Sequence, residues 1–178
     1  MRNLAATMLG LSIAALGAGC TTASNDVAAP TATAALAAGD GATRGSASIT
    51  QGSDGLHVKV MAVGLTPGAH AVHVHTAGTC TPPDFTSAGG HWNPTGRQHG
   101  KDNPAGMHMG DMPDLVAGAD GTGTLEYVVP GGMIATGSMP LLDADGAAVV
   151  IHASPDDNRT DPAGNAGKRI ACGVISAS

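Results

Sequence analysis

The sequence predicts an all-β protein, a Greek-key β-sandwich or barrel of the immunoglobulin-like kind, and three observations support this prediction. Short segments in which apolar and polar residues alternate recur along the chain, and Gly and Pro residues interrupt them. No long stretch shows the periodicity of an amphipathic helix. Pairs that favour tight turns separate the apolar segments, at Asp54-Gly55, Asp120-Gly121 and Asp145-Gly146.

The clearest alternation lies between residues 56 and 62. Its apolar residues share one face of a strand and its polar residues share the other. The same pattern recurs over residues 124–129. Residues 147–151 and 170–175 are apolar throughout, which is typical of strands buried on both faces.

The chain begins with a segment typical of exported proteins. Arg2 precedes an apolar run from Leu4 to Leu16, and small residues lead up to Cys20. We interpret residues 1–19 as a secretory signal peptide, too short for a good membrane-spanning helix. Acylation of Cys20 in a lipoprotein is the favoured processing route, and cleavage at a nearby Ala by the ordinary signal peptidase is the alternative. The expected location is the periplasm, with membrane attachment if Cys20 carries a lipid.

Residues 20–40 are dominated by Ala and Thr and contain no aromatic residue. Because they offer few large apolar side chains to offset the entropy of ordering, we predict a flexible tether. A short Ala-rich helix over residues 34–38 is the alternative. The folded domain is then expected to span residues 41–178.

The charge balance of the chain is acidic, with fourteen Asp and Glu against eight Lys and Arg, a net charge of −6. We predict no nucleic-acid partner. The overall field would repel a small anion, so attraction of one would need a local positive field.

Six of the eight histidines fall between residues 70 and 111. Among them, His73 and His75 alternate with valines, so on a strand both imidazoles would point to one face and could bind one ion. Imidazole suits copper and zinc, and a carboxylate can complete a tetrahedral zinc site. The Gly- and Pro-rich segment that follows is expected to be a long functional loop.

Five separated motifs occur in one order and with compatible spacings over roughly residues 41–178. They are Gly68-Ala69-His70-Ala71-Val72-His73-Val74-His75, Gly89-Gly90-His91-Trp92-Asn93-Pro94, His108-Met109-Gly110-Asp111, Val150-Ile151-His152, and Gly164-Asn165-Ala166-Gly167-Lys168-Arg169-Ile170-Ala171-Cys172-Gly173-Val174-Ile175. Together they resemble the bacterial copper/zinc superoxide dismutases. The resemblance implies the same Greek-key fold, with long metal-binding and electrostatic loops.

The resemblance implies one copper and one zinc ion per chain. It assigns copper to His73, His75, His91 and His152, and zinc to His91, His99, His108 and Asp111. The shared residue, His91, would lose both ring protons to bind two ions, which two neighbouring dications make accessible. It would then act as a proton carrier.

The resemblance also names a carboxylate that links a copper ligand to a zinc ligand. Asp156 matches it and would join His73 to His99, fixing the orientation of both rings. Asp157 is the alternative if the loop is shifted by one residue.

Arg169 matches the arginine that guides superoxide to copper, and Lys168 adds to the local field. Cys80 and Cys172 match the intrachain disulfide of the family. It would close a segment of about ninety residues and stabilise the fold by roughly 4 to 5 kcal/mol, if loop-closure entropy accounts for the effect.

The implied function is dismutation of superoxide to oxygen and hydrogen peroxide by a copper redox cycle, in antioxidant defence of the cell envelope. A metal carrier or copper chaperone with a dismutase-like domain is one alternative, although a carrier does not need Arg169. A β-sandwich with degenerate metal sites is another. The sequence leaves open whether the protein is a monomer or a homodimer.

Several residues in and around the motifs are given structural interpretations. His57 is expected to be exposed on a strand, His70 to form structural hydrogen bonds, and Trp92 to pack. The methionines close to His108 and Asp111 allow a copper-loading surface, but filling of the core or loop is favoured. These are Met107, Met109 and Met112.

Overall fold

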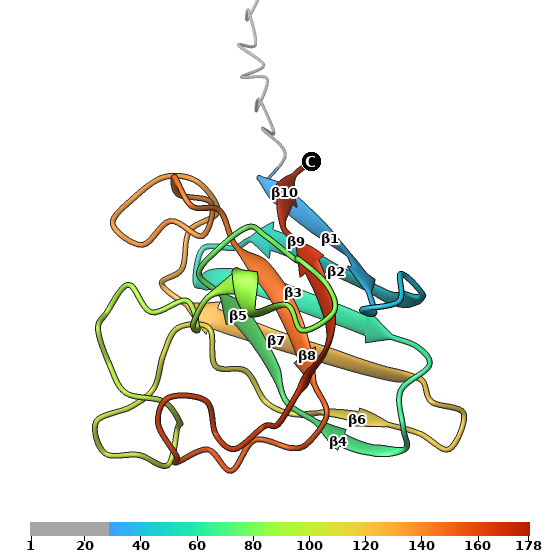
Figure 1. The fold of residues 1–178 in the computed structure, drawn as a ribbon. Helices are drawn as coiled ribbons and strands as arrows, with labels where there is room; N and C mark the ends of the chain where they lie inside the picture. Colours follow the sequence, from blue (N-terminus) through green and yellow to red (C-terminus); the bar gives the residue numbers. More distant parts are fainter. Residues whose placement is uncertain (1–28) are drawn as a thin grey trace, which may run out of the picture.

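A computed structural model describes residues 29–178 of the chain (Figure 1). The strands are β1 (Thr31–Ala37), β2 (Thr43–Gln51), β3 (Gly55–Ala62), β4 (Gly68–His70), β5 (Val72–His75), β6 (Leu115–Ala117), β7 (Gly123–Pro130), β8 (Ala148–His152), β9 (Arg169–Val174) and β10 (Ser176–Ala177). One 3₁₀ helix, η1 (Thr86–Ala88), lies in the loop after β5. Within this part of the chain, no helix is long and apolar enough to cross a membrane.

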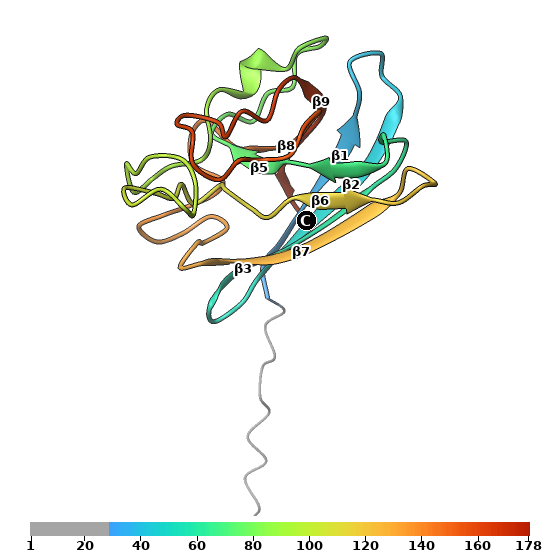
Figure 2. The same cartoon turned by 90° about the horizontal axis from the view of Figure 1, so that it is seen from below.

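Eight of the strands in residues 29–178 form one curled antiparallel sheet in the order β5-β8-β9-β1-β2-β3-β7, with β10 beside β1. The strands β4 and β6 pair as a separate two-stranded ribbon, which lies against the curled sheet in Figure 2. Consecutive strands β1, β2 and β3 are neighbours, whereas β5 pairs with β8 and β9 pairs with β1. Such long-range connections define a Greek key, so the predicted all-β fold is confirmed.

The predicted strands lie close to their expected positions. In β3, alternate side chains are buried and exposed, and the strand pairs in register with β2 and β7. All residues of β8 are buried, as the continuous apolar run predicts. Three glycines of the predicted turns, Gly55, Gly121 and Gly146, have positive φ angles, which a glycine adopts without steric cost.

The prediction of a flexible tether over residues 20–40 is wrong for its second half. Thr31–Ala37 forms β1, which pairs with β2, β9 and β10 and buries Ala32, Ala34 and Leu36. Three neighbouring strands supply hydrogen-bond partners and apolar surface, so small side chains suffice for burial. The alternative helix over residues 34–38 is also wrong, and the domain begins at β1. The expected signal peptide, Cys20 and residues 21–28 lie outside the described residues.

The core fills the inside of the curled sheet. Its largest fully buried aliphatic side chains are Leu36, Ile49, Leu56, Leu115, Leu141 and Ile151. Trp92 is 3% exposed and packs in this core, as expected. The predicted disulfide between Cys80 and Cys172 is present, with Cα atoms 5.7 Å apart, and it ties the loop after β5 to β9.

Candidate metal centre

Two strands deliver three histidines to one buried position. In β5, His73 and His75 point to the same side, and this strand pairs antiparallel with β8. The last residue of β8 is His152. The three side chains are at most 3% exposed, so the sheet fixes them in the protein interior.

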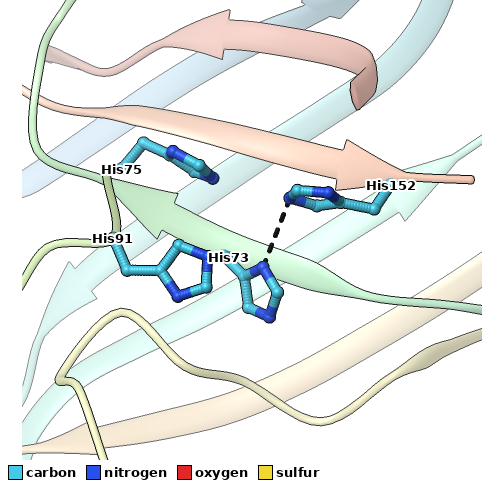
Figure 3. Close-up of side chains that lie close together, drawn as sticks. All are labelled: His73, His75, His91 and His152. Atoms are coloured by element: carbon cyan, nitrogen blue, oxygen red, sulfur yellow. Dashed lines mark hydrogen bonds between the residues drawn. The ribbon is translucent and has the colours of Figure 1, made fainter. Parts of the chain in front are cut away.

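A fourth histidine from the loop, His91, completes this group (Figure 3). One ring nitrogen from each of the four residues lies within 4.8 Å of the others, and Nδ1 of His73 is 3.3 Å from Nε2 of His152. Two more nitrogens, Nε2 of His75 and of His91, are buried and have no hydrogen-bond partner among residues 29–178. Buried polar atoms normally have a partner, so these lone pairs fit a metal ion that all four rings approach.

The loop between β5 and β6 provides a second group around the other side of His91. It contains Nδ1 of His91, His99 and His108 and Oδ1 of Asp111. Nδ1 of His99 and Nδ1 of His108 each lie 3.3 Å from Nδ1 of His91 and 3.1 Å from Oδ1 of Asp111. A fifth separation, between Nδ1 of His91 and Oδ1 of Asp111, is 2.8 Å.

Four of these separations, at 3.1 or 3.3 Å, are close to the edges of a tetrahedron. Two ligand atoms about 2.0–2.1 Å from a tetrahedral zinc ion are about 3.3 Å apart. Three nitrogens and one carboxylate oxygen are also a suitable donor set for zinc. His73 lies within reach of this group too, but its Nδ1 faces His152 and its Nε2 contacts Asp156. His73 therefore belongs to the four-histidine group.

The two groups share His91 through its two different nitrogens. Nδ1 of His91 lies in the tetrahedral group, and Nε2 is one of the two buried atoms without a hydrogen-bond partner in the described part of the chain. If both groups held an ion, the imidazole ring of His91 would contact one ion through each of its two nitrogens. The arrangement is what the sequence resemblance leads us to expect for a bridging histidine.

Asp156 contacts both groups. Its Oδ2 accepts a hydrogen bond from Nε2 of His73 at 2.8 Å, and its Oδ1 accepts one from Nε2 of His99 at 2.9 Å. Asp157, the alternative from the sequence, is exposed and instead caps the backbone at Arg159 and Thr160. The contact of Asp156 leaves no room for a side chain at Gly164, where a Cβ atom would collide with Oδ1.

Backbone carbonyls set the tautomers of two histidines. Nδ1 of His75 donates to the Gly89 carbonyl at 3.0 Å, which leaves its Nε2 free of a proton and able to bind a metal. His152 is arranged similarly, with Nδ1 3.4 Å from the Gly167 carbonyl. His70 has the structural role expected of it, because its two nitrogens lie 2.8 Å from the carbonyls of Thr66 and His152.

The two groups differ in how their histidines titrate. Burial and repulsion from neighbouring histidines lower the pKa of His75 to about 2 and of His152 to about 3. Burial also lowers the pKa of His91, to about 4, although Asp111 opposes it. Burial would lower the pKa of His99 as well, but hydrogen bonds to Asp111 and Asp156 raise it to about 9.

Arg169 lies at the mouth of the four-histidine group. It lines a hollow of about 370 Å³ together with His75, His91 and His152. Its guanidinium donates to the carbonyls of Phe85 and Gly89, at 2.7 Å each. These contacts hold a permanent cation beside the histidine nitrogens, where a small anion can enter.

Asp161, which none of the sequence motifs contains, also contributes to this site. Its Oδ1 accepts the backbone N–H of His99 at 2.6 Å, across the space between two loops. Gly110 was quoted only as part of a motif, yet it hydrogen-bonds Val74 and Trp92 so closely that a Cβ atom would collide with the Val74 carbonyl. Nothing in the local sequence around Asp161 distinguishes it from other loop aspartates.

The fold and the two linked ligand groups define a class of protein: a Greek-key β protein with a histidine-bridged pair of metal sites. The family model for copper/zinc superoxide dismutase (SODC) matches residues 43–175. A superoxide dismutase [Cu-Zn] of Caulobacter vibrioides is 46% identical over 147 residues, covering 81% of this chain and 84% of that protein. The chain therefore belongs to the copper/zinc superoxide dismutase family.

Solved structures agree with this assignment. The copper/zinc superoxide dismutase from Brucella abortus is 32% identical, with a TM-score of 0.65, and the match covers 82% of this chain and 99% of that one. A SOD-like protein from Bacillus subtilis has a TM-score of 0.76 at 38% identity, covering 79% of this chain and 95% of that one.

Proposed function

We propose that this protein is an exported copper/zinc superoxide dismutase, which converts two superoxide anions and two protons into oxygen and hydrogen peroxide. The observation that carries the proposal is the pair of buried nitrogens of His75 and His91, which have no hydrogen-bond partner among the residues that the structure describes. They face a common position in the four-histidine group, next to the tetrahedral group and below the Arg169 cation. Family membership supports the same activity.

The ligand assignment follows from the two groups. His73, His75, His91 and His152 would hold copper, and His91, His99, His108 and Asp111 would hold zinc. When bound, copper supplies alternating one-electron oxidation and reduction, whereas zinc supplies charge and fixed geometry without redox chemistry.

Two side chains act on substrate or protons, and a third positions the ligands. Arg169 binds and orients the superoxide anion at the mouth, with its guanidinium held by two carbonyls. Nε2 of His91 accepts a proton for delivery to the second superoxide, while Nδ1 stays within the tetrahedral group. Asp156 positions His73 and His99 and touches neither substrate nor its protons.

Export is supported by the leader-like residues 1–19 and by the disulfide between Cys80 and Cys172, which an oxidising compartment preserves. We propose acylation of Cys20, which would attach the protein to a membrane facing the periplasm. Labelling with a radioactive fatty acid tests this, and equal labelling of wild type and Cys20→Ala would contradict it.

The activity is tested by following superoxide decay after a radiolysis pulse, with residues 29–178 loaded with copper and zinc. We expect decay that depends on copper and falls roughly tenfold or more in Arg169→Ala at low ionic strength. Lys59→Ala is the matched control, because it removes a cation paired with Glu126 on the sheet surface. Decay no faster than in the copper-free protein, with both metals bound, would contradict the proposal and favour a metal carrier.

A further inference from the structure

A hollow of about 270 Å³ lies beside the tetrahedral group and is lined by three methionines. They are Met107, Met109 and Met139, and His108, Tyr127 and Pro130 also face it. Met107 and Met109 flank His108 in the loop before β6. Met139 comes from the separate loop between β7 and β8.

The three methionines differ in their setting from the core methionine of the same region. Met112 is 3% exposed and packs inside the sheet, whereas the three are only half-buried. The segment bearing Met139 is held by a hydrogen bond from the Met133 amide to the Met139 carbonyl, at 3.2 Å. Three half-buried methionines from two loops therefore line one hollow at the surface.

The methionine hollow adjoins the mouth at which Arg169 lies. His108 lines both hollows, so they meet at one side chain. An ion bound among the methionines would be separated by one shared lining residue, His108, from the hollow that His75, His91 and His152 line, without occupying either ligand group described above.

Thioethers have a distinct preference among metals. They are neutral and soft ligands that bind Cu(I), whereas zinc and Cu(II) favour imidazole, thiolate or carboxylate. One cation, Arg97, also faces the hollow, but it is exposed and donates to the Gly106 carbonyl at 3.2 Å. Solvent screening limits its repulsion of a monovalent ion.

We infer that Met107, Met109 and Met139 form a Cu(I)-binding site, separate from the two ligand groups, at which copper enters the protein. The bound ion would leave the thioethers for the stronger nitrogen donors of the four-histidine group, and no electron is transferred in this step. The entry role rests on the proposed function, but the existence of the site does not.

The existence of the site is tested with the holoprotein, after metal analysis confirms one copper and one zinc per chain. Cu(I) is added without oxygen in competition with bicinchoninate. We expect about one further Cu(I) per chain and sulfur neighbours in its X-ray absorption spectrum. The extra ion should be lost in the triple variant Met107→Leu, Met109→Leu, Met139→Leu, since leucine keeps the volume and removes the sulfur.

Met61→Leu is the matched control, because Met61 is 48% exposed on β3 and does not line the hollow. It should retain the extra Cu(I). Absence of a further Cu(I) in the wild type, or equal binding in the triple variant, would overturn the inference. Either result is independent of superoxide decay, which reports on the proposed function alone.

The entry role is tested by supplying Cu(I) to protein that carries only zinc. Copper incorporation, followed by metal analysis after quenching with chelator, should be at least tenfold slower in the triple variant than in Met61→Leu. Equal rates would overturn the entry role.

Discussion

The four-histidine group and the tetrahedral group, which we propose to hold copper and zinc and call the copper side and the zinc side, are held in place by different kinds of structure. His73, His75 and His152 lie on β5 and β8, whose backbones are joined in register by antiparallel pairing. His99, His108 and Asp111 lie on an irregular loop. The sheet therefore preorganises the copper side, whereas the zinc side depends mainly on contacts between loops, with one isolated bridge from Asp111 to His73 of β5.

Those loop contacts are specific and mostly charged. Oδ2 of Asp111 accepts the backbone N–H groups of Gly100 and His108, at 2.9 and 3.0 Å. Asp156 and Asp161 reach His99 from the loop between β8 and β9. Carboxylates thus provide for the loop the order that backbone pairing provides for the strands.

The largest effect is expected from removing a strand ligand. His152→Ala should lower superoxide dismutation at least a thousandfold, to the level of copper-free protein, while zinc content stays unchanged. Pulse radiolysis and metal analysis on the same sample measure both quantities.

His57→Ala is the control, since His57 is an exposed strand histidine paired with Asp54 at 2.7 Å. It should leave both quantities unchanged. Loss of zinc from His152→Ala in parallel with copper would show that the two halves are not separable.

The next largest effect concerns the disulfide that fastens the loop to β9. The double variant Cys80→Ser, Cys172→Ser should lose about 4 to 5 kcal/mol of unfolding free energy, because the bond closes a sequence separation of 92 residues. Denaturant unfolding of the metal-free proteins measures the loss. A change below about 1 kcal/mol would mean that loop closure in the unfolded chain does not account for the stabilising effect of the bond.

Asp156→Asn should affect the zinc side more than the copper side. The carboxylate holds His99 by a ring nitrogen, so we expect zinc affinity to fall roughly 10- to 100-fold in a chelator competition. Copper affinity should fall less, since β5 still holds His73. Asp157→Asn, which alters only the exposed cap, is the control, and equal losses in the two variants would contradict the role of Asp156.

The contrast between strand and loop also explains which metal ligands the local sequence pattern could predict. A period of two residues places His73 and His75 on one face wherever a strand forms, so local pattern was enough. The loop ligands needed family motifs, because no periodicity links His99 or Asp111 to the strands. The role of Asp161 could not be predicted, since it depends on two loops meeting.

The missed strand β1 shows the converse limit. Its side chains are small and carry little hydrophobic information, and their burial depends on neighbours that are distant in sequence. Ala37 lies opposite Cys172, and Ala32 lies opposite Ala177. The composition of residues 20–40 predicts disorder, because composition carries no information about pairing partners at the other end of the chain.

The smallest effect is a difference in proton release between the two halves of the metal-free protein. At pH 7.5 His99 is protonated, because its pKa is about 9, whereas His75 and His152 are neutral. Zinc must displace the Nδ1 proton of His99. We therefore expect zinc alone to release about one proton per ion, and copper alone clearly less.

The same shifts give opposite pH dependences to the stability of the metal-free protein. His99 has a pKa raised above its ordinary 6.5, so its contribution is present below pH 6.5 and is lost as the pH rises through about 9. His75 and His152 have lowered pKa values, so their contribution to stability is present above pH 6.5 and is lost as the pH falls toward about 2 for His75 and about 3 for His152.

Proton release is measured by calorimetry of single-metal binding in buffers of different ionisation enthalpy, and stability is measured by unfolding at each pH. Equal proton release by the two metals would show that protonation does not separate the strand-held half from the loop-held half.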